Sequence, residues 1–488
     1  MDPLQARSPL ASRHPLLEVW FLAWPTIITM TSYTVMQFVD KLMVGQIGPL
    51  ELTAQGNGGI WAFTPLAFLM GALVVVNTYV SQNMGAGRPE KVARYLWGGV
   101  HISIVVWLVV LVPFAAIMPW FFENVVHSGH TIDDMDRLIE LESEYSQILL
   151  LGGLFTICAR SVHQFFFGIM RPKVVTVAVI IGNIVNVALN YVLIFGDAGH
   201  PALNLPGVPG VPALGVHGAA IGTVVGVFVE LMIPFVVFLG PRCHREFASR
   251  TSWRPHLKTI RELIRLGWPG SLVSGNEIIC WSIFMTVLVG IFGENSMTAG
   301  WIVLGYMHLS FMPAVAISFA ANTLVGNAIG SGKPDLAASH ARWSVGLSIF
   351  FMSCCAVLFV VFRGPMIELF LGGDVEPEQF RDILDIGTNL MIVMAICQAL
   401  DALGITYSGA LRGAGDVIWP GVFIAVSSWT LIIGLGYLLA VQMPQWGAIG
   451  PWIGAVIYIV VVGIAMAWRF ESGKWRSIKL VDFDEEHA

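Results

Sequence analysis

The sequence predicts an all-α integral membrane protein with twelve transmembrane helices in two pseudo-symmetric six-helix lobes. Of its 488 residues, 56% are hydrophobic and only 12% are charged, whereas an ordinary soluble domain carries about a quarter charged residues. Several apolar segments, such as residues 100–121, reach the roughly 20 residues that a helix needs to cross a bilayer. Short motifs of the first half also recur, in the same order, in the second half.

The apolar runs are interrupted by Gly, Pro and charged residues, which set the expected span boundaries. A helix satisfies every backbone polar group inside its own span, and the runs are too long and alternate too little for membrane β-strands. The expected spans are 16–44, 52–80, 94–121, 146–170, 174–196, 213–239, 266–292, 296–325, 343–371, 383–411, 416–441 and 446–468.

The basic residues are distributed unevenly between the connections. Most of the 26 Lys and Arg residues fall in the two tails and the even-numbered connections, and residues 240–265 alone hold seven. This bias predicts that both termini and the middle connection are cytoplasmic. The third connection is acidic, as suits the outer side; its acids are Asp133, Asp134, Asp136, Glu140, Glu142 and Glu144.

The two halves repeat each other in four motifs. "LAWPTIITM" at Leu22 matches "LGWPGSLVS" at Leu266, and "GAGRP" at Gly85 matches "GSGKP" at Gly330; "VGQIGPLELTA" and "GVHGAAIG" also have counterparts. Six helices per half make the repeat parallel. The expected organisation is a cytoplasmic tail (1–15), an amino-terminal lobe (16–239), a basic linker (240–265), a carboxyl-terminal lobe (266–468) and a cytoplasmic tail (469–488).

Five ionisable side chains lie inside expected spans: Asp40, Arg160, Glu230, Glu277 and Asp401. A charged side chain at mid-bilayer costs about 2.5–3.5 kcal/mol on insertion scales, so such residues normally face the bundle interior and mark an ion or substrate pathway. The alternative is an internal structural pair, such as a carboxylate held by Arg160.

Other polar residues occur in the expected spans of the same lobe as Asp40. Asn183, Asn186 and Asn190 are spaced i, i+3 and i+7, which places them on one helix face. An amide ladder of this kind either binds helices together or, with Asp40 and Thr223, forms an oxygen cage for a hard cation or for a proton held on the acid.

The second half carries its acids elsewhere. The repeat places Asp401 opposite Arg160 and Asp40 near Met285, so the lobes share a scaffold but not a set of charges. Glycines four apart at 218, 222 and 226 indicate close helix packing. Pro25 can kink the first span and is a candidate gate.

Over nearly its whole length, the sequence resembles the multidrug and toxic compound extrusion (MATE) transporters. The residues that carry the resemblance are "WP" in the first span, "DKLMVGQIG", "QNMGAGRP", "NIVNVALNYVLIFG" followed by "GVHGAAIGT", and "LRGAGD" at Leu411. The resemblance implies two lobes around a V-shaped central cavity, which exchange sodium ions or protons for organic, mainly cationic, substrates by alternating access.

The resemblance also implies site residues. Asp40, Asn186, Asn190 and Thr223 match the amino-lobe cation site of the family, and Pro25 matches its bending proline. Glu277 and Asp401 look like the carboxyl-lobe acids of the NorM-like branch, where they would bind substrate or a second ion. One departure is Cys397, which stands where that branch would have a tyrosine.

We therefore expect a monomeric secondary antiporter in the plasma (inner) membrane that exports organic cations. It would need no cofactor besides its coupling ion, no metal beyond a possible sodium ion at Asp40, and no nucleic acid. A lipid-linked oligosaccharide flippase is the alternative, but it should have a strongly basic cavity, and the deep charges here are mostly acidic. An enzyme is not expected, since neither HExxH nor a GxSxG serine occurs.

Overall fold

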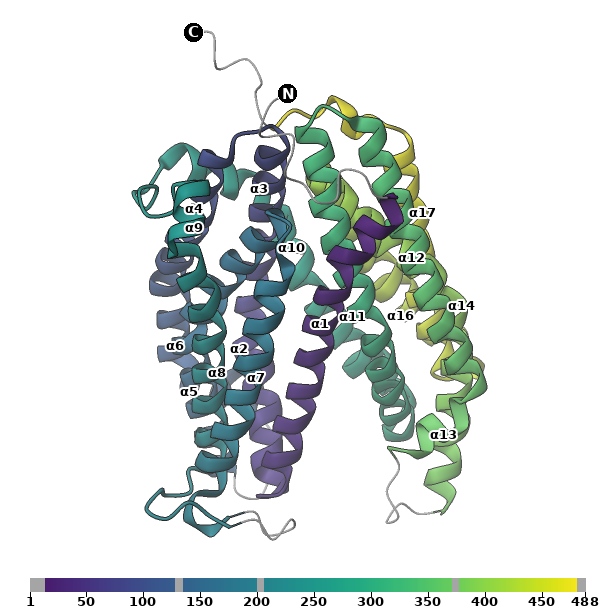
Figure 1. Ribbon diagram of the computed structural model, residues 1–488. Coiled ribbons are helices and arrows are strands. Elements are labelled where there is room, and N and C mark those ends of the chain that lie inside the picture. Colours follow the sequence, from purple (N-terminus) through teal and green to yellow (C-terminus); the bar gives the residue numbers. More distant parts are fainter. Residues whose placement is uncertain (1–13, 128–134, 200–205, 371–376, 481–488) are drawn as a thin grey trace. The chain divides into compact units, whose positions relative to one another are not determined.

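The computed structural model describes residues 14–127, 135–199, 206–370 and 377–480. Residues 1–13 and 481–488 of the two predicted tails, together with Asp133 and Asp134 of the acidic connection, lie outside the described residues. Every regular element within these ranges is helical (Figure 1). The prediction of an all-α protein is therefore confirmed.

The chain divides into two compact units. The amino unit comprises Ile28–Val76 and Pro89–Gly267, and the carboxyl unit comprises Met1–Ile27, Asn77–Arg88 and Trp268–Ala488. The first and seventh spans each pass from one unit to the other, because the boundaries fall at Ile27 and Gly267. The lobe boundaries expected from the sequence remain a prediction.

The amino unit is built from long α-helices and short π-helical or 3₁₀ segments, which are labelled η. Its elements are most of α1 (Pro15–Gly45), α2 (Pro49–Leu73), α4 (Pro89–Val106), η2 (Trp107–Leu111), α5 (Val112–Phe121), η3 (Phe122–Val126), α6 (Met135–Gly168), α7 (Pro172–Phe195), η4 (Gly196–Ala198), α8 (Gly215–Leu239) and α9 (Pro241–Phe247). Within this unit α7 packs along α8, and α6 packs against both α2 and α8.

The carboxyl unit repeats this plan with longer helices. Its elements are α3 (Val75–Gly85), most of α10 (Leu257–Ile283), η6 (Phe284–Val289), η7 (Gly290–Phe292), α11 (Glu294–Gly330), α12 (Pro334–Val361), α13 (Arg363–Glu368), α14 (Pro377–Ala414), α15 (Ile418–Ser427), η8 (Ser428–Leu435), α16 (Gly436–Gln442), η9 (Pro444–Trp446), α17 (Ile449–Glu471) and η10 (Lys474–Ser477). Here α14 packs against α11, α12 and α17.

Prolines and glycines set many helix ends. Within the described ranges seven α-helices begin at a proline, including α2, α7 and α12, because the first helical position needs no N–H and suits the fixed φ of proline. The repeated turns "GAGRP" and "GSGKP" each place a glycine at positive φ, Gly87 at 72° and Gly332 at 69°. The repeat seen in the sequence is therefore also a repeat of turn geometry.

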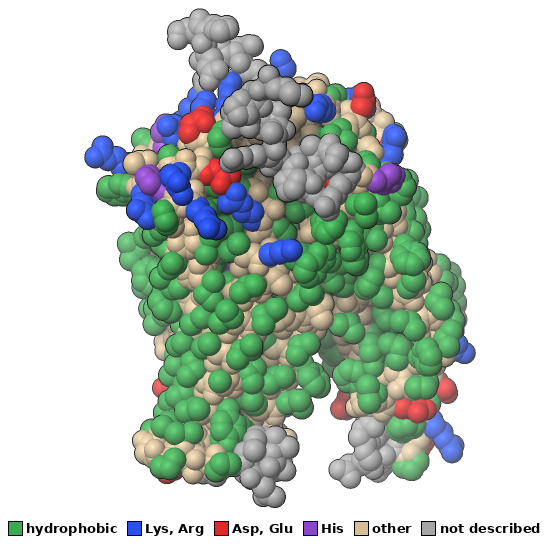
Figure 2. All heavy atoms as spheres, viewed as in Figure 1, with side chains coloured by type: hydrophobic (Ala, Val, Ile, Leu, Met, Phe, Trp, Pro, Cys, Tyr) green, Lys and Arg blue, Asp and Glu red, His purple; other side chains and the backbone are tan. Residues whose placement is uncertain are grey.

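Eleven helices of the described chain are long and apolar enough to cross a membrane. The 31-residue α1 is not among them, since Thr, Ser, Tyr and Gln side chains lower its hydropathy, but its length suffices to span. With α1 the count is twelve, as predicted. Figure 2 shows broad hydrophobic surfaces on the helices of the amino unit, with Lys and Arg gathered near α9.

Candidate functional site

Four helices of the amino unit surround Asp40. One side of the site is an apolar core of buried side chains that ties α1, α6, α7 and α8 together; its members include Val44, Tyr145, Ile194, Phe195, Val216, Ala219 and Ala220. These contacts fix the rotation of each helix about its axis. The polar residues predicted for the cation site therefore point to a common place.

Asp40 is held there by amides. Its carboxylate Oδ1 accepts a hydrogen bond of 2.7 Å from Nδ2 of Asn190, and Asn186 bonds to it as well. Only 7% of Asp40 is exposed, against 1% of Asn186 and none of Asn190. Asn186 Nδ2 also donates to the Thr223 hydroxyl at 3.3 Å. The structure thus brings together all four residues predicted for this site.

The partners found for Asp40 among the described residues are electrically neutral. They are Asn190, Asn186 and the nearby Tyr145. Arg160 instead interacts with Tyr33 and His163, also in the amino unit. The carboxylate is therefore not fixed to a permanent cation in this part of the chain, which is the arrangement that an exchangeable cation requires.

Two amide oxygens beside Asp40 have unused acceptor capacity. Oδ1 of Asn186 and Oδ1 of Asn190 are buried without a hydrogen bond within the described ranges. A carboxylate, two amide oxygens and a hydroxyl form a donor set of the kind that hard cations bind. The residues present therefore fit a sodium ion, and the carboxylate alone fits a proton.

Glycines on α8 make room for this amide ladder. A methyl group added at Gly222 would lie 2.0 Å from Asn190 Oδ1, and one at Gly226 would lie 2.8 Å from Asn186 Cβ. At Gly218 the same group would meet the α7 backbone at Leu193, 2.6 Å away. The glycines thus serve helix packing, as expected, and Gly222 also borders the candidate cation site directly.

Sequence reasoning missed two neighbours of Asp40. Tyr145 of α6 is 6% exposed and lies within electrostatic reach of Asp40, and it bonds to Gln55 of α2. Tyr145 follows the acidic third connection and Gln55 lies in the second turn of α2, and the sequence gives no sign that either side chain turns inward. A polar residue that interrupts an apolar helix face would have been the only signal.

Glu277 and Asp401 also come together, in the carboxyl unit. Asp401 interacts electrostatically with Glu277, and Glu277 interacts with Arg412. Glu277 is exposed and Asp401 is half-buried, so this acidic pair faces open space more than Asp40 does. Tyr458 of α17 lies near both acids. Cys397 is buried, and its thiol donates a hydrogen bond to the carbonyl of Met394 at 3.2 Å.

Pro25 lies within α1, which continues as a helix on both sides of it. It is buried, and the boundary between the two units follows directly after Ile27. Its corresponding residue, Pro269, follows the other crossing point, after Gly267. The gating role of Pro25 remains a prediction.

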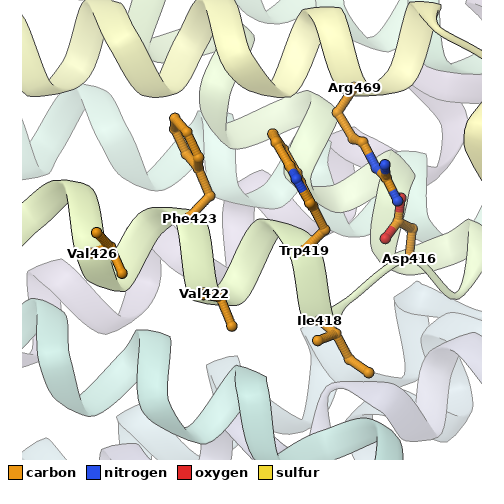
Figure 3. Close-up of a pocket in the computed structure, with 7 residues that line it drawn as sticks. All are labelled: Asp416, Ile418, Trp419, Val422, Phe423, Val426 and Arg469. Carbon is orange, nitrogen blue, oxygen red and sulfur yellow. The ribbon is translucent and has the colours of Figure 1, made fainter.

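A surface hollow of the carboxyl unit lies apart from these residues. It has a volume of about 550 Å³ and is lined by Asp416, Ile418, Trp419, Val422, Phe423, Val426 and Arg469 (Figure 3). Arg469 Nε donates to Asp416 at 2.6 Å, and its guanidinium lies over Trp419. Neither the Asp40 group nor the Glu277 group contributes to this hollow.

The family model that matches this chain is MatE. It matches twice, over residues 25–192 and residues 277–438, and so covers more than half of the chain. The chain belongs to the MatE (MATE) family. It is therefore a membrane transporter and not an enzyme, and the doubled match coincides with the internal repeat.

Relatives of this MATE protein cover nearly all of it. It is 29% identical over 469 residues to the multidrug resistance protein NorM of Burkholderia vietnamiensis, covering 95% of each chain. It is 27% identical over 460 residues to the multidrug resistance protein MdtK of Edwardsiella ictaluri, covering 92% of this chain and 93% of that one. The resemblance to the NorM-like branch is confirmed.

The fold also matches solved structures. A MOP superfamily transporter from Pyrococcus furiosus superposes with a TM-score of 0.82 at 18% identity, covering 96% of this chain and 98% of the other. At this identity the match supports the fold alone. It agrees with the predicted twelve-helix, two-lobe architecture.

Proposed function

We propose that this MATE protein is a secondary active antiporter that exports organic, mainly cationic, drugs in exchange for sodium ions or protons. The observation that carries the proposal is the buried carboxylate of Asp40, whose partners among the described residues are neutral amides and a phenol. The names of its relatives, multidrug resistance proteins NorM and MdtK, support the export of drugs.

The coupling follows from thermodynamic linkage. If the cation at Asp40 and the drug favour opposite states of one two-state element, the binding of each promotes release of the other. A tenfold ion gradient supplies about 1.4 kcal/mol, and a 100 mV potential supplies about 2.3 kcal/mol per charge moved. Exchange of one monovalent ion for one monovalent drug cancels the voltage contribution.

The remaining predicted residues take the other roles. Glu277 and Asp401 would bind the organic cation or a second ion, since two neighbouring carboxylates in one unit attract positive charge. Pro25 would be the point at which α1 bends during exchange. The protein would act as a monomer in the inner (plasma) membrane, with both termini cytoplasmic.

The test is transport by purified protein in liposomes. Uptake or efflux of ethidium, a fluorescent organic cation, is driven separately by a sodium step and by a pH step. We expect one of the two steps to drive transport, and Asp40→Asn to reduce this transport at least 100-fold, since the amide cannot hold the ion or the proton.

The matched control is Glu142→Gln, which removes another buried carboxylate of the same unit. Glu142 has a fully buried side chain and accepts a hydrogen bond of 2.7 Å from Asn57. This variant should keep ion-driven transport. Undiminished transport by Asp40→Asn would refute the assignment of the coupling site, and transport by the wild-type protein in neither gradient would refute the antiporter.

A further inference from the structure

A second group of ionisable side chains is buried in the amino unit, apart from the Asp40 site. The Tyr33 hydroxyl of α1 donates a hydrogen bond to Glu230 Oε1 of α8, and His163 Nε2 of α6 lies 3.6 Å from the same oxygen. The side chains of His163 and Glu230 are 7% and 5% exposed. Arg160 of α6 interacts electrostatically with both Tyr33 and His163.

This group lies at a fixed spacing from the Asp40 site. Three helices pass through both levels with seven residues between them: the pairs are Tyr33 and Asp40 on α1, Asn183 and Asn190 on α7, and Glu230 and Thr223 on α8. Seven residues of α-helix rise by about 10.5 Å. The group is therefore a second polar level, two turns from Asp40 in the direction of Pro25.

The internal repeat gives this level a counterpart in the carboxyl unit. The Trp-Pro pairs at Pro25 and Pro269 set an offset at which Tyr33 corresponds to Glu277. Arg160 corresponds to Asp401 by the same repeat. The acids of the carboxyl unit thus occupy the level at which the amino unit holds Tyr33, Arg160 and Glu230. Both units therefore carry ionisable side chains at this level of the repeat.

The chemistry of the group favours a proton over a metal ion as its ligand. Arg160 places a fixed positive charge within reach of Tyr33 and His163, which opposes any second cation. A proton needs only one acceptor, however, whereas a metal ion needs several oxygen ligands. Glu230 and the imidazole of His163 both accept protons. The Tyr33 hydroxyl already donates its hydrogen bond to Glu230.

Among the described residues, the other elements packed on Glu230 contribute no further charge. α7 approaches through Gly182, where an added methyl group would lie 2.9 Å from Glu230 Cβ, and through Asn183, which donates to Ser32 at 2.7 Å. In the described part of the unit the titratable groups that face Glu230 are thus Tyr33 and His163, and Arg160 lies within electrostatic reach of both. Each comes from α1 or α6.

We propose that Glu230, with Tyr33 and His163, is a second proton-binding site of the amino unit, which loads and releases a proton in the same cycle as Asp40. The proposal rests on the proposed antiport. In the exchange step one O–H bond breaks at Asp40 and one at Glu230, and both protons pass to water as one organic cation binds. Two protons for one monovalent cation leave a net charge to move, so exchange responds to membrane voltage.

The first test counts protons released on substrate binding. Full-length protein in detergent, with a pH-indicator dye in weakly buffered solution, is mixed with ethidium over a series of pH values. At the maximum we expect two protons per ethidium bound for the wild-type protein, and one each for Glu230→Gln and Asp40→Asn. Glu142→Gln, the buried carboxylate far along α6 from His163, should still release two.

The outcomes separate the two proposals. If Glu230→Gln releases as many protons as the wild-type protein, Glu230 only balances the charge of its surroundings, and the second site is refuted while the antiporter stands. If ethidium transport is driven by sodium without any proton release, the second site is refuted in the same way. If neither gradient drives transport, the antiporter fails and the second site fails with it.

A second variant tests the group without removing the acid. Tyr33→Phe keeps the ring and loses only the hydrogen bond to Glu230, a contact that stabilises the ionised carboxylate. The pH midpoint of one of the two proton releases should rise by about one unit, with the number of protons unchanged. An unchanged midpoint would contradict a proton site at Glu230, since a purely structural tyrosine would alter stability instead.

Discussion

The two units place different chemistry at the level of Asp40. In the amino unit this level holds the Asp40 carboxylate, which accepts hydrogen bonds from the amides of Asn186 and Asn190 on regular α-helices. In the carboxyl unit the repeat leads to Phe284 and Met285, both fully buried in an apolar core. The helices there are also wound differently, since Phe284–Val289 and Ser428–Leu435 form π-helices.

The comparison shows that the repeated scaffold specifies where helices lie, and individual side chains specify what each level can bind. The Phe284 ring packs edge-on against Trp281 and Trp452, with ring centroids 5.4 and 5.2 Å apart. Such a level can hold a lobe together, but its side chains offer no oxygen ligand to an inorganic cation. The carboxyl unit instead places its acids, Glu277 and Asp401, at the other level.

The largest expected effect is on the stability of the carboxyl unit. Phe284→Ala should lower the free energy of unfolding by about 3–5 kcal/mol, because it leaves a cavity in a fully buried core. The measurement is thermal or denaturant unfolding in detergent, together with binding of the coupling ion. Ion affinity should stay within about twofold, a change of ~0.4 kcal/mol.

Phe38→Ala on α1 is the control for that loss, since Phe38 is 58% exposed and its removal opens no cavity. It should change stability by less than about 0.5 kcal/mol. A strong loss of coupling-ion affinity in Phe284→Ala would contradict the division of roles between the units.

The next largest effect concerns substrate. Replacing both acids in Glu277→Gln/Asp401→Asn should weaken binding of an organic cation about 1000-fold, or ~4.1 kcal/mol. At about 8 Å and an effective dielectric of about 20, each lost charge interaction is worth about 2 kcal/mol. Tryptophan fluorescence or isothermal titration with ethidium would measure it.

The control is Asp382→Asn, which replaces an exposed acid of the same helix α14 and should bind ethidium normally. Normal ethidium binding by the double variant would exclude Glu277 and Asp401 from the substrate site.

A smaller effect compares two glycines at corresponding positions of the repeat, Gly222 and Gly454. Gly222→Ala would place a methyl group 2.0 Å from Asn190 Oδ1, and Gly454→Ala would place one 2.8 Å from the backbone oxygen of Leu431. Overpacking of either site costs about 1–3 kcal/mol. Gly222→Ala should therefore weaken binding of the coupling ion about tenfold, whereas Gly454→Ala should lower stability alone.

Binding of sodium, or its competition with protons, would be measured for both alanine variants beside their melting temperatures. Gly454→Ala should melt earlier yet bind the coupling ion normally. Equal ion affinities for the two variants would mean that Gly222 serves packing alone.

The sequence predicted the helices and the asparagine face of α7, because both depend on local spacing. Apolar runs and proline starts define the helices, and the i, i+3, i+7 spacing of the asparagines defines a helix face. Contacts between helices depend on their rotation and register, which spacing does not give. For this reason the nearness of Tyr145 to Asp40, and the bond from Tyr33 to Glu230, could not be predicted. The alternative expected from the sequence, an ion pair between a carboxylate and Arg160, is not found for Asp40 among the described residues.

The smallest expected effect concerns Tyr458, which lies near the acidic pair although α17 was not expected to contribute to it. The NorM-like pattern led us to expect a tyrosine at position 397, where Cys397 is buried in the core. Tyr458 of α17 instead lies within electrostatic reach of Glu277 and Asp401. Tyr458→Phe should weaken ethidium binding about threefold to tenfold, since one hydrogen-bonding hydroxyl is worth about 0.5–1.5 kcal/mol.

Tyr407→Phe is the matched control for the Tyr458 variant. Its hydroxyl donates to Glu471 at 3.0 Å, away from the acidic pair, so ethidium affinity should not change. If Tyr458→Phe binds ethidium as the wild-type protein does, then α17 contributes only packing to this level. The carboxyl unit would in that case recognise cations through its two acids alone, and the two units would differ more in chemistry than their shared scaffold suggests.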